Sequence, residues 1–139
     1  MGAARLLKYI PRMTNRQPVS AADAPKAIGP YSQAIWSGQE LFCSGQTPID
    51  PATGALITGD VTAQTHRVFD NLAAVLAAAG LTLDHAIKCN VYLVDMADFG
   101  AMNAAYQTRF SAPFPARTTV AVAGLPLGAR VEIELIARR

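Results

Sequence analysis

The sequence predicts an α+β fold with the element order ββαβαββ, in which two helices cover one face of a mixed sheet. Three observations support this prediction: one long amphipathic helical pattern, several short apolar runs with the period of strands, and turn-forming residues between them. The chain has 139 residues, of which 51% are hydrophobic and 16% charged. This composition fits a single globular domain and excludes a disordered chain.

The first two strands are expected at Ala34–Trp36 and Leu41–Cys43. The four residues between them, 37–40, contain a glycine and predict a β-hairpin. Ser44-Gly45-Gln46 is expected to close the second strand, and the loop over 48–54 is dense in turn-forming residues.

The first helix has the clearest pattern in the chain. Asp60 is expected to cap its start, and Gly80 stands where a glycine ends a helix. Between them apolar residues recur at helical spacing, at Val61, Val68, Leu72, Val75, Leu76 and Ala79.

A strand is expected next, because Ile87, Cys89, Val91 and Leu93 alternate with polar or amphipathic residues. A second helix is expected to begin near Asp95 or Asp98 and to end before Pro113 and Pro115, with an apolar stripe of Phe99, Met102, Tyr106 and Phe110. Two strands, at about 118–123 and 130–137, finish the chain and are joined by the loop 124–128. Helices on one side leave the other sheet face bare, and the apolar residues of the strands predict that other subunits cover it.

Residues 1–21 are expected to form a flexible N-terminal extension, and residues 22–139 a single domain. A weak transit-like leader, or a true start at Met13, are the alternatives for the extension. It carries four of the twelve basic residues, and without it the chain is slightly acidic, which argues against a nucleic-acid partner. No apolar stretch is long enough to predict a membrane span. The two cysteines, Cys43 and Cys89, are expected to be reduced and buried, which places the protein in the cytoplasm.

Few residues predict chemistry on local grounds. His66 and His85 are the only histidines and have no partner at metal-ligand spacing, so neither a metal nor a cofactor is expected. Arg117, at the start of an apolar strand, offers a planar fork for a carboxylate, or is an ordinary arginine at a strand end. Glu132 and Glu134 share one strand face, where a carboxylate either orients water or is simply solvated.

Two further segments have the same two interpretations. The amides of Ser44 and Gly45 could receive an anion, or belong to a plain turn. Tyr31 could line a site or only pack.

Short motifs occur in order from about Ala22 to the C-terminus. They are residues 27–34, 43–46, Pro48, 50–54, 69–72, 78–81, 91–93 with Asp95 and Phe99, Asn103 with Tyr106, 114–118, 125–126 and 131–134. Together, these segments closely resemble the RidA (YjgF) family of reactive intermediate deaminases, also known as L-PSP endoribonuclease-like proteins.

The resemblance implies a chorismate-mutase-like fold that assembles into a homotrimeric barrel with sites between subunits. It also implies an enzyme that needs no cofactor, a hydrolase of C–N bonds. Its substrates would be reactive 2-imino acids such as 2-iminobutyrate or 2-iminopropionate, which it would convert to 2-keto acids and ammonia as a form of metabolite damage control.

By resemblance, Arg117 holds the substrate carboxylate and Glu132 is linked to the attacking water. The substrate-binding positions are Tyr31, Ser44, Gly45, Asn103, Thr119 and Pro126. Thr119 departs from many relatives, which carry cysteine there. The alternatives are a 2-aminomuconate deaminase, a non-catalytic small-molecule-binding trimer, and an endoribonuclease or translation inhibitor.

One geometric difficulty accompanies this assignment. If the last two strands pair symmetrically about their loop, Glu132 faces Ala121, an offset of roughly 13 Å along the strand from Arg117. A shifted register, the long arginine side chain or a neighbouring subunit would each close that gap.

Overall fold

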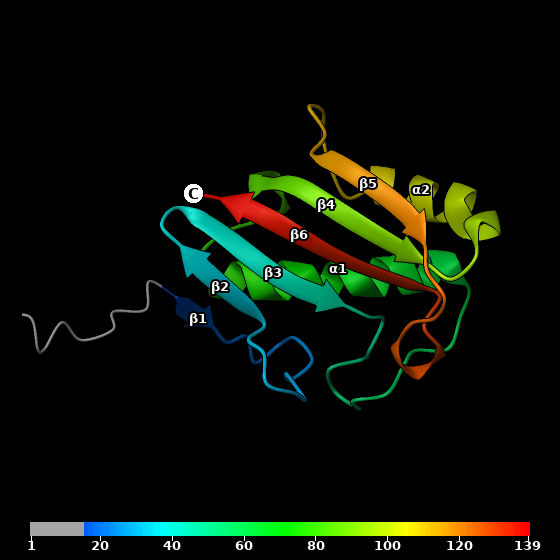
Figure 1. The fold of residues 1–139 in the computed structure, drawn as a ribbon, viewed down its shortest axis with the longest axis horizontal. Helices are drawn as coiled ribbons and strands as arrows, with labels where there is room; N and C mark the ends of the chain where they lie inside the picture. The colour runs from blue at the N-terminus through cyan, green and yellow to red at the C-terminus, as the bar shows by residue number, and fades with distance from the viewer. Residues whose placement is uncertain (1–15) are drawn as a thin grey trace, which may run out of the picture.

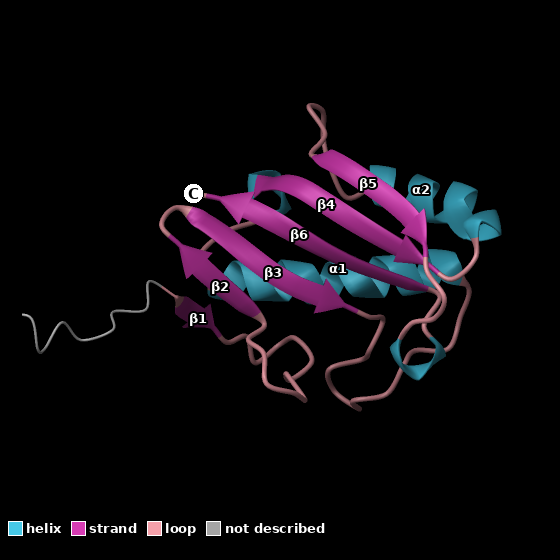
Figure 2. Ribbon diagram, in the orientation of Figure 1, coloured by secondary structure: helices cyan, strands magenta, loops and turns pink. Residues whose placement is uncertain are grey.

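The computed structural model describes residues 16–139, which form one six-stranded sheet with two α-helices on one of its faces (Figures 1 and 2). The strands are β1 (Gln17–Val19), β2 (Ala34–Ser37), β3 (Glu40–Gln46), β4 (Ala86–Leu93), β5 (Ala116–Ala121) and β6 (Val131–Arg138). The helices are α1 (Val61–Ala78) and α2 (Phe99–Gln107), and the short 3₁₀ turns are η1 (Leu83–His85), η2 (Met96–Asp98) and η3 (Pro126–Gly128).

The strands lie in the order β1-β2-β3-β6-β4-β5, and only β4 and β5 are parallel. A parallel pair needs a crossover, which α2 supplies between β4 and β5. The predicted α+β class, with two helices on one face of a mixed sheet, is confirmed.

The strand β1 lies within the segment 1–21 that the sequence analysis assigns to an extension. It pairs antiparallel with β2, and Val19 and Ala21 are buried in the core. Gln33 holds this segment in place, because its side-chain oxygen accepts from the Ala21 N–H at 2.6 Å and its amide nitrogen donates to the Pro25 carbonyl at 2.8 Å. Residues 1–15 lie outside the described residues.

The predicted boundaries of α1 are confirmed. The Asp60 carboxylate accepts a hydrogen bond from the Ala63 N–H at 2.9 Å, as an N-cap does. At the other end Gly80 has φ +77°, and the Gly80 and Leu81 N–H groups donate to the Ala77 and Leu76 carbonyls. These two bonds form a Schellman motif, which a left-handed glycine makes possible.

The two aspartates proposed for the start of the second helix have different roles. Asp95 caps η2 through the Ala97 N–H, whereas Asp98 makes no side-chain cap bond and pairs with Arg130 at 2.6 Å. The predicted apolar stripe of α2 faces the core, where Met102 and Tyr106 are buried. The strand alternation of β4 holds except at Ile87, which a register irregularity between Ala86 and Lys88 leaves 45% exposed.

The last two strands do not pair with each other, which corrects the symmetric hairpin considered from the sequence. β4 lies between β5 and β6 and bonds to both. Residue pairs across this sheet run Arg117–Cys89–Leu135 and Val120–Tyr92–Glu132. The crossover through α2 sets this order, and the loop 124–128 alone does not reveal it.

Helices cover only one of the two faces of the sheet. The helix face forms the core with α1 and α2, whereas the opposite face, called here the open face, is left bare (Figure 1). On the open face Phe42 is 43% exposed and Val120 is 41% exposed, and Ile35 and Ile136 are partly exposed. Among residues 16–139 no helix is both long and apolar enough to cross a membrane.

Candidate active site

Arg117 projects from β5 to the helix face of the sheet and lies against α2. Its guanidinium carbon is 4.6 Å from the centre of the Tyr106 ring and 5.7 Å from that of Phe99. Within residues 16–139 no carboxylate lies within salt-bridge distance of it, since the two ion pairs found there use Arg109 and Arg130. The guanidinium is thus held by aromatic rings while its N–H donors remain available to a ligand.

A cavity of about 400 Å³ opens beside this guanidinium. It is lined by Asn103, Tyr106, Gln107, Phe114, Pro115 and Arg117. The predicted substrate-binding residue Asn103 is therefore next to Arg117, one helical turn from both Phe99 and Tyr106 along α2. A charged fork, amide groups and apolar walls suit a small carboxylic acid.

Two hydroxyl groups on the helix side of β5 are buried without a hydrogen-bond partner among the described residues, Tyr106 Oη and Thr119 Oγ1. The Cys89 thiol is close to Tyr106 Oη but does not meet hydrogen-bond geometry. Burial, and secondarily this thiol, raise the pKa of Tyr106. Burial also raises the pKa of Cys89, although Arg117 and Lys88 oppose the shift. Both groups are therefore neutral at physiological pH, so Arg117 gains no anionic partner from them.

Glu132 lies on the open face, the side of the sheet opposite Arg117. Its Cα pairs with that of Tyr92 on β4, and its carboxyl group lies against the backbone of Gly45 on β3. A Cβ atom at position 45 would be only 2.8 Å from Glu132 Oε1. Burial first, and the charge of Glu134 second, raise the pKa of Glu132. Its carboxylate is therefore a stronger base than an exposed one.

Glu134 is held by β4. Its Oε1 accepts from the Tyr92 hydroxyl at 2.5 Å and from Asn90 Nδ2 at 3.2 Å. The hydrogen bond to Glu134 is the main cause that raises the pKa of Tyr92 to about 12. Glu134 thus serves as a fixed acceptor beside Glu132.

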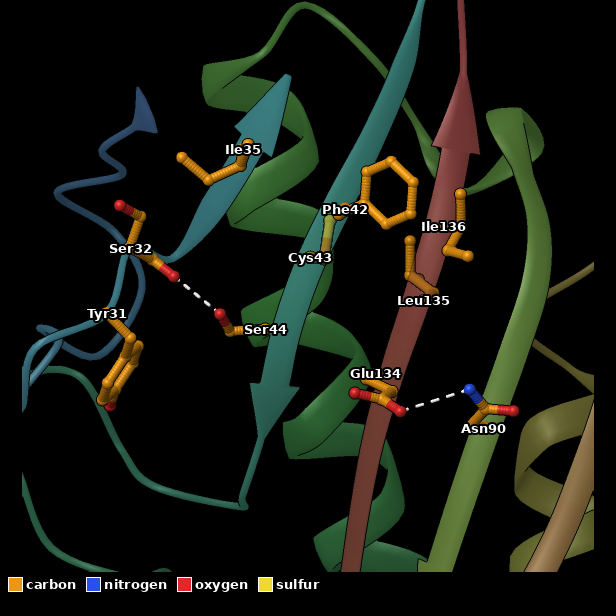
Figure 3. A pocket seen from close by; sticks show the side chains of 10 residues that line it. All are labelled: Tyr31, Ser32, Ile35, Phe42, Cys43, Ser44, Asn90, Glu134, Leu135 and Ile136. Atoms are coloured by element: carbon orange, nitrogen blue, oxygen red, sulfur yellow. Dashed lines mark hydrogen bonds between the residues drawn. The ribbon is translucent and has the colours of Figure 1, made fainter. Parts of the chain in front are cut away.

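A second cavity, of about 440 Å³, lies on the open face (Figure 3). Tyr31 and Ser44 line it together with Ser32, Asn90, Glu134 and the apolar residues Ile35, Phe42, Cys43, Leu135 and Ile136. The Ser44 hydroxyl donates to the Ser32 carbonyl at 2.6 Å, and the Ser44 N–H donates to the Gln33 carbonyl at 3.0 Å. The Ser44 N–H is therefore already used, which leaves, of the two interpretations, the plain turn for this amide.

The predicted site residues thus fall into two groups within one chain. Arg117, Asn103 and Thr119 lie on the helix side around β5. Tyr31, Ser44, Gly45 and Glu132 lie on the open face around β3 and β6. Pro126 stands apart in η3, is exposed, and lines neither cavity.

Tyr106 and Tyr92 are not among the site residues predicted from the sequence. Tyr106 was predicted only as part of an apolar stripe, yet Phe99, Asn103 and Tyr106 are spaced i, i+4, i+7 and share a helix face. That spacing was the available signal. No comparable local signal marks the Tyr92 contact, because it joins residues 42 positions apart.

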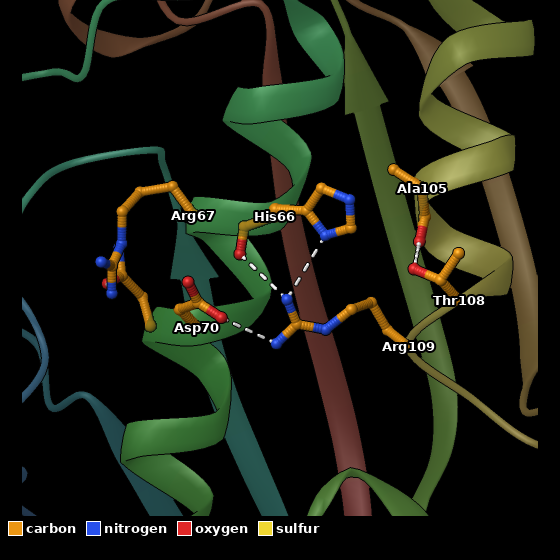
Figure 4. Close-up of polar contacts among 7 residues, drawn as sticks. His66, Arg67, Asp70, Ala105, Thr108 and Arg109 are labelled. Atoms are coloured by element: carbon orange, nitrogen blue, oxygen red, sulfur yellow. Dashed lines mark hydrogen bonds and ion pairs between the residues drawn. The ribbon is translucent and has the colours of Figure 1, made fainter.

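The histidines take no part in either group. His66 Nδ1 lies 3.4 Å from Arg109, which also pairs with Asp70 at 2.8 Å and so joins the end of α2 to α1 (Figure 4). His85 belongs to the capping box of η1 with Thr82. Within residues 16–139 no group of three or more possible metal ligands comes together.

Comparison with known proteins identifies relatives over nearly the whole described chain. The family model described as endoribonuclease L-PSP matches residues 21–139. Protein DfrA of Myxococcus xanthus is 48% identical over 128 residues, which cover 91% of this chain and 98% of DfrA. The mouse (Mus musculus) 2-iminobutanoate/2-iminopropanoate deaminase is 44% identical over 122 residues, which cover 88% of this chain and 90% of the mouse protein.

Solved structures agree with these matches. RidA from the Antarctic bacterium Psychrobacter sp. PAMC 21119 superposes with a TM-score of 0.86 at 43% identity, over 89% of this chain and 100% of that one. E. coli TdcF with bound serine gives a TM-score of 0.84 at 39% identity, over 88% and 98% of the two chains. Because the family model and relatives above 40% identity both span the domain that contains the two site groups, this chain belongs to the L-PSP endoribonuclease family, the RidA/YjgF family of reactive intermediate deaminases.

Proposed function

We propose that this protein hydrolyses reactive 2-imino acids, such as 2-iminobutyrate and 2-iminopropionate, to 2-keto acids and ammonia. The observation that supports it most is the Arg117 guanidinium, which faces a cavity with its donors free and no acidic partner in the described chain. A buried or half-buried cation without a counter-ion is costly, and a ligand carboxylate would supply one. The mouse relative named as a 2-iminobutanoate/2-iminopropanoate deaminase supports the same reaction.

The working site would form between two copies of the chain. Arg117 and Glu132 project from opposite faces of one sheet, so a single chain does not bring them together. We propose a homotrimer in which the open face of one subunit lies against the β5 edge of the next. The exposed apolar side chains of Phe42 and Val120 favour such cover.

The chemistry needs few groups. Arg117 would bind the carboxylate by two charge-assisted hydrogen bonds and so fix the adjacent C=N carbon. Glu132 from the neighbouring copy would take a proton from a water molecule as its oxygen bonds to that carbon. Glu132 would return that proton to the nitrogen. The C–N bond of the tetrahedral adduct would then break to release ammonia, and the new hydroxyl group would lose its proton to become the ketone oxygen. Imines hydrolyse unaided in water, so positioning and one base could suffice without a cofactor.

The remaining site assignments follow from this arrangement. Tyr31, Ser44 and Gly45 would enclose the substrate on the Glu132 side, and Asn103 and Thr119 on the Arg117 side. Pro126 would contribute only through a neighbouring copy. The cytoplasmic location stays a prediction from the cysteines, both of which are buried and free.

The direct test is release of 2-ketobutyrate from freshly generated 2-iminobutyrate, comparing native protein with Arg117→Ala. We expect acceleration by the native protein and its loss in the variant. A folded native protein that binds 2-ketobutyrate without accelerating hydrolysis would support the small-molecule-binding alternative instead. Light scattering at micromolar concentration tests the trimer separately, since a monomeric mass would remove the inter-subunit site.

A further inference from the structure

Arg117 is positioned by aromatic side chains instead of by acids. Its guanidinium carbon lies 4.6 Å from the Tyr106 ring centre, well inside the range of a cation–π contact, while the Phe99 contact at 5.7 Å is near its limit. A ring face attracts the cation without accepting its N–H groups. An acidic partner would hold the same guanidinium more strongly, but it would occupy the fork that a ligand carboxylate needs.

The Tyr106 ring is itself fixed from behind. It is 4% exposed, contacts Phe69 edge-on at 5.5 Å between ring centres, and lies 4.9 Å from Phe110. Phe69 belongs to α1 and Phe110 follows α2, so both helices support the ring. Such packing leaves a buried aromatic ring few orientations, and this makes it a rigid platform for the guanidinium.

The Tyr106 hydroxyl has no hydrogen-bond partner among the described residues, although it is buried. A buried hydroxyl without a partner does not stabilise the fold, and its removal is often neutral or favourable. The contact with Arg117 is made by the ring face. The ring, and not the hydroxyl, is therefore the part of Tyr106 that acts on Arg117.

We propose that Tyr106 is a positioning residue for the substrate carboxylate, whose ring holds the Arg117 guanidinium beside the cavity with its N–H fork free. This inference rests on the proposed function, because it assumes that Arg117 binds a carboxylate. It extends that function by naming the side chain that holds the Arg117 guanidinium in its binding orientation when no ligand is bound. Removal of the ring should weaken binding of substrate and transition state alike, which raises KM and leaves kcat nearly unchanged.

Three variants of the full chain separate the ring from the hydroxyl and from general packing. Tyr106→Leu removes the ring and Tyr106→Phe keeps it. Phe110→Leu removes a ring of the same cluster that makes no cation–π contact with Arg117 in the described part of the chain. The readouts are kcat and KM with 2-iminobutyrate, the Kd of 2-ketobutyrate by calorimetry, and the melting temperature. The Kd is an equilibrium value for 2-ketobutyrate, so it does not depend on whether the protein catalyses the reaction.

We expect Tyr106→Leu to raise KM and Kd by about tenfold, the effect of losing a partly desolvated cation–π contact. Tyr106→Phe should stay within about twofold of native and melt at the same or a higher temperature. Phe110→Leu should lower the melting temperature but change KM and Kd by no more than about twofold, because Phe69 and the new leucine still pack against the Tyr106 ring. The proposal is overturned if Tyr106→Leu matches Phe110→Leu in KM and Kd, or if Tyr106→Phe is as impaired as Tyr106→Leu.

Failure of the proposed function would look different. A native protein that binds 2-ketobutyrate but never accelerates imine hydrolysis would refute the deaminase, while the Kd series would still decide the role of Tyr106. A native protein that binds no 2-ketobutyrate would overturn the carboxylate site and the role of Tyr106 together.

Discussion

The surroundings of Arg117 and of Glu132 differ in how far one chain completes them. Arg117 is fixed by Tyr106 and Phe99, whose own packing comes from α1 and α2 of the same chain. Glu132 lies on the open face, which no helix covers and where Tyr31, a lining residue of the cavity there, is 51% exposed. Within one chain, therefore, the surroundings of Arg117 are packed, whereas those of Glu132 are open on one side.

If Arg117 and Glu132 form one site, a single chain does not complete it. Arg117 and Glu132 lie on opposite faces, and β4 lies between their strands, so no movement of side chains brings them together. If they cooperate, they do so across a subunit boundary. Closed symmetry makes that arrangement recur at every interface of a cyclic oligomer.

The largest expected effect comes from mixing two inactive variants. Arg117→Ala and Glu132→Gln should each lose most activity, since each removes one half of every site. Trimers formed from an equal mixture should contain about one quarter of native sites, because each mixed ring holds one intact Arg117–Glu132 interface. The measurement is keto-acid release after co-expression of the two chains.

The control is a mixture of the two variants purified separately under conditions in which subunits do not exchange. That mixture should remain inactive. If co-expressed trimers also stay inactive while their light-scattering mass is trimeric, Arg117 and Glu132 do not share a site across the interface.

A smaller effect is expected from a single methyl group beside Glu132. In Gly45→Ala the new Cβ would lie 2.8 Å from Glu132 Oε1, so the carboxyl group must move, while the fold tolerates the change because only a side-chain end gives way. A misplacement of about 1 Å at the reacting groups can reduce the rate about 100-fold. We expect a loss of kcat of that order with a nearly native melting temperature.

Gly100→Ala is the matched control, since a Cβ there meets nothing within 4 Å and the position lies in α2 near Arg117's aromatic partners. It should keep activity and slightly raise the melting temperature, because alanine favours a helix over glycine. Equal activity losses in the two variants would mean that the effect of Gly45→Ala does not come from its contact with Glu132.

The sequence predicted what depends on neighbouring residues. The Asp60 cap and the Gly80 end of α1 are local hydrogen-bond patterns, and the alternation of β4 reflects one buried face. The short strand β1 was missed because its three residues include Pro18 and are too few to alternate; as an edge strand it tolerates that proline.

What the sequence could not predict depends on distant contacts. The separation of β5 from β6 by β4 follows from the crossover through α2, and it moves Glu132 away from Arg117. The hydrogen bond of Tyr92 to Glu134 and the stacking of Tyr106 on Arg117 are likewise non-local. Family resemblance named the candidate site residues, but not which of them one chain brings together.

The smallest expected effect concerns the charge of Glu132 and stability. In the folded chain burial and Glu134 raise its pKa, and Tyr92 is the other titratable group beside it. Below the unfolded carboxyl pKa of about 4.3 both states are protonated and the group contributes nothing. Between that value and the raised folded pKa, the unfolded chain has released its proton while the native carboxyl group still holds one, so stability falls as pH rises and stays lower above the folded pKa. Glu132→Gln should therefore leave the melting temperature unchanged at pH 3.5 and raise it by a few degrees at pH 7.5.

If Arg117 of a neighbouring copy lies near Glu132, it should reduce this rise in melting temperature, because a cation near Glu132 favours its charged form. The stabilisation at pH 7.5 should then be larger in an Arg117→Ala background than in the native one, and the difference should vanish at pH 3.5. Within one chain the two residues face opposite sides of the sheet and have no direct route for such coupling. Equal rises in melting temperature in both backgrounds would mean that no Arg117 of a neighbouring copy lies near Glu132 in the assembled protein.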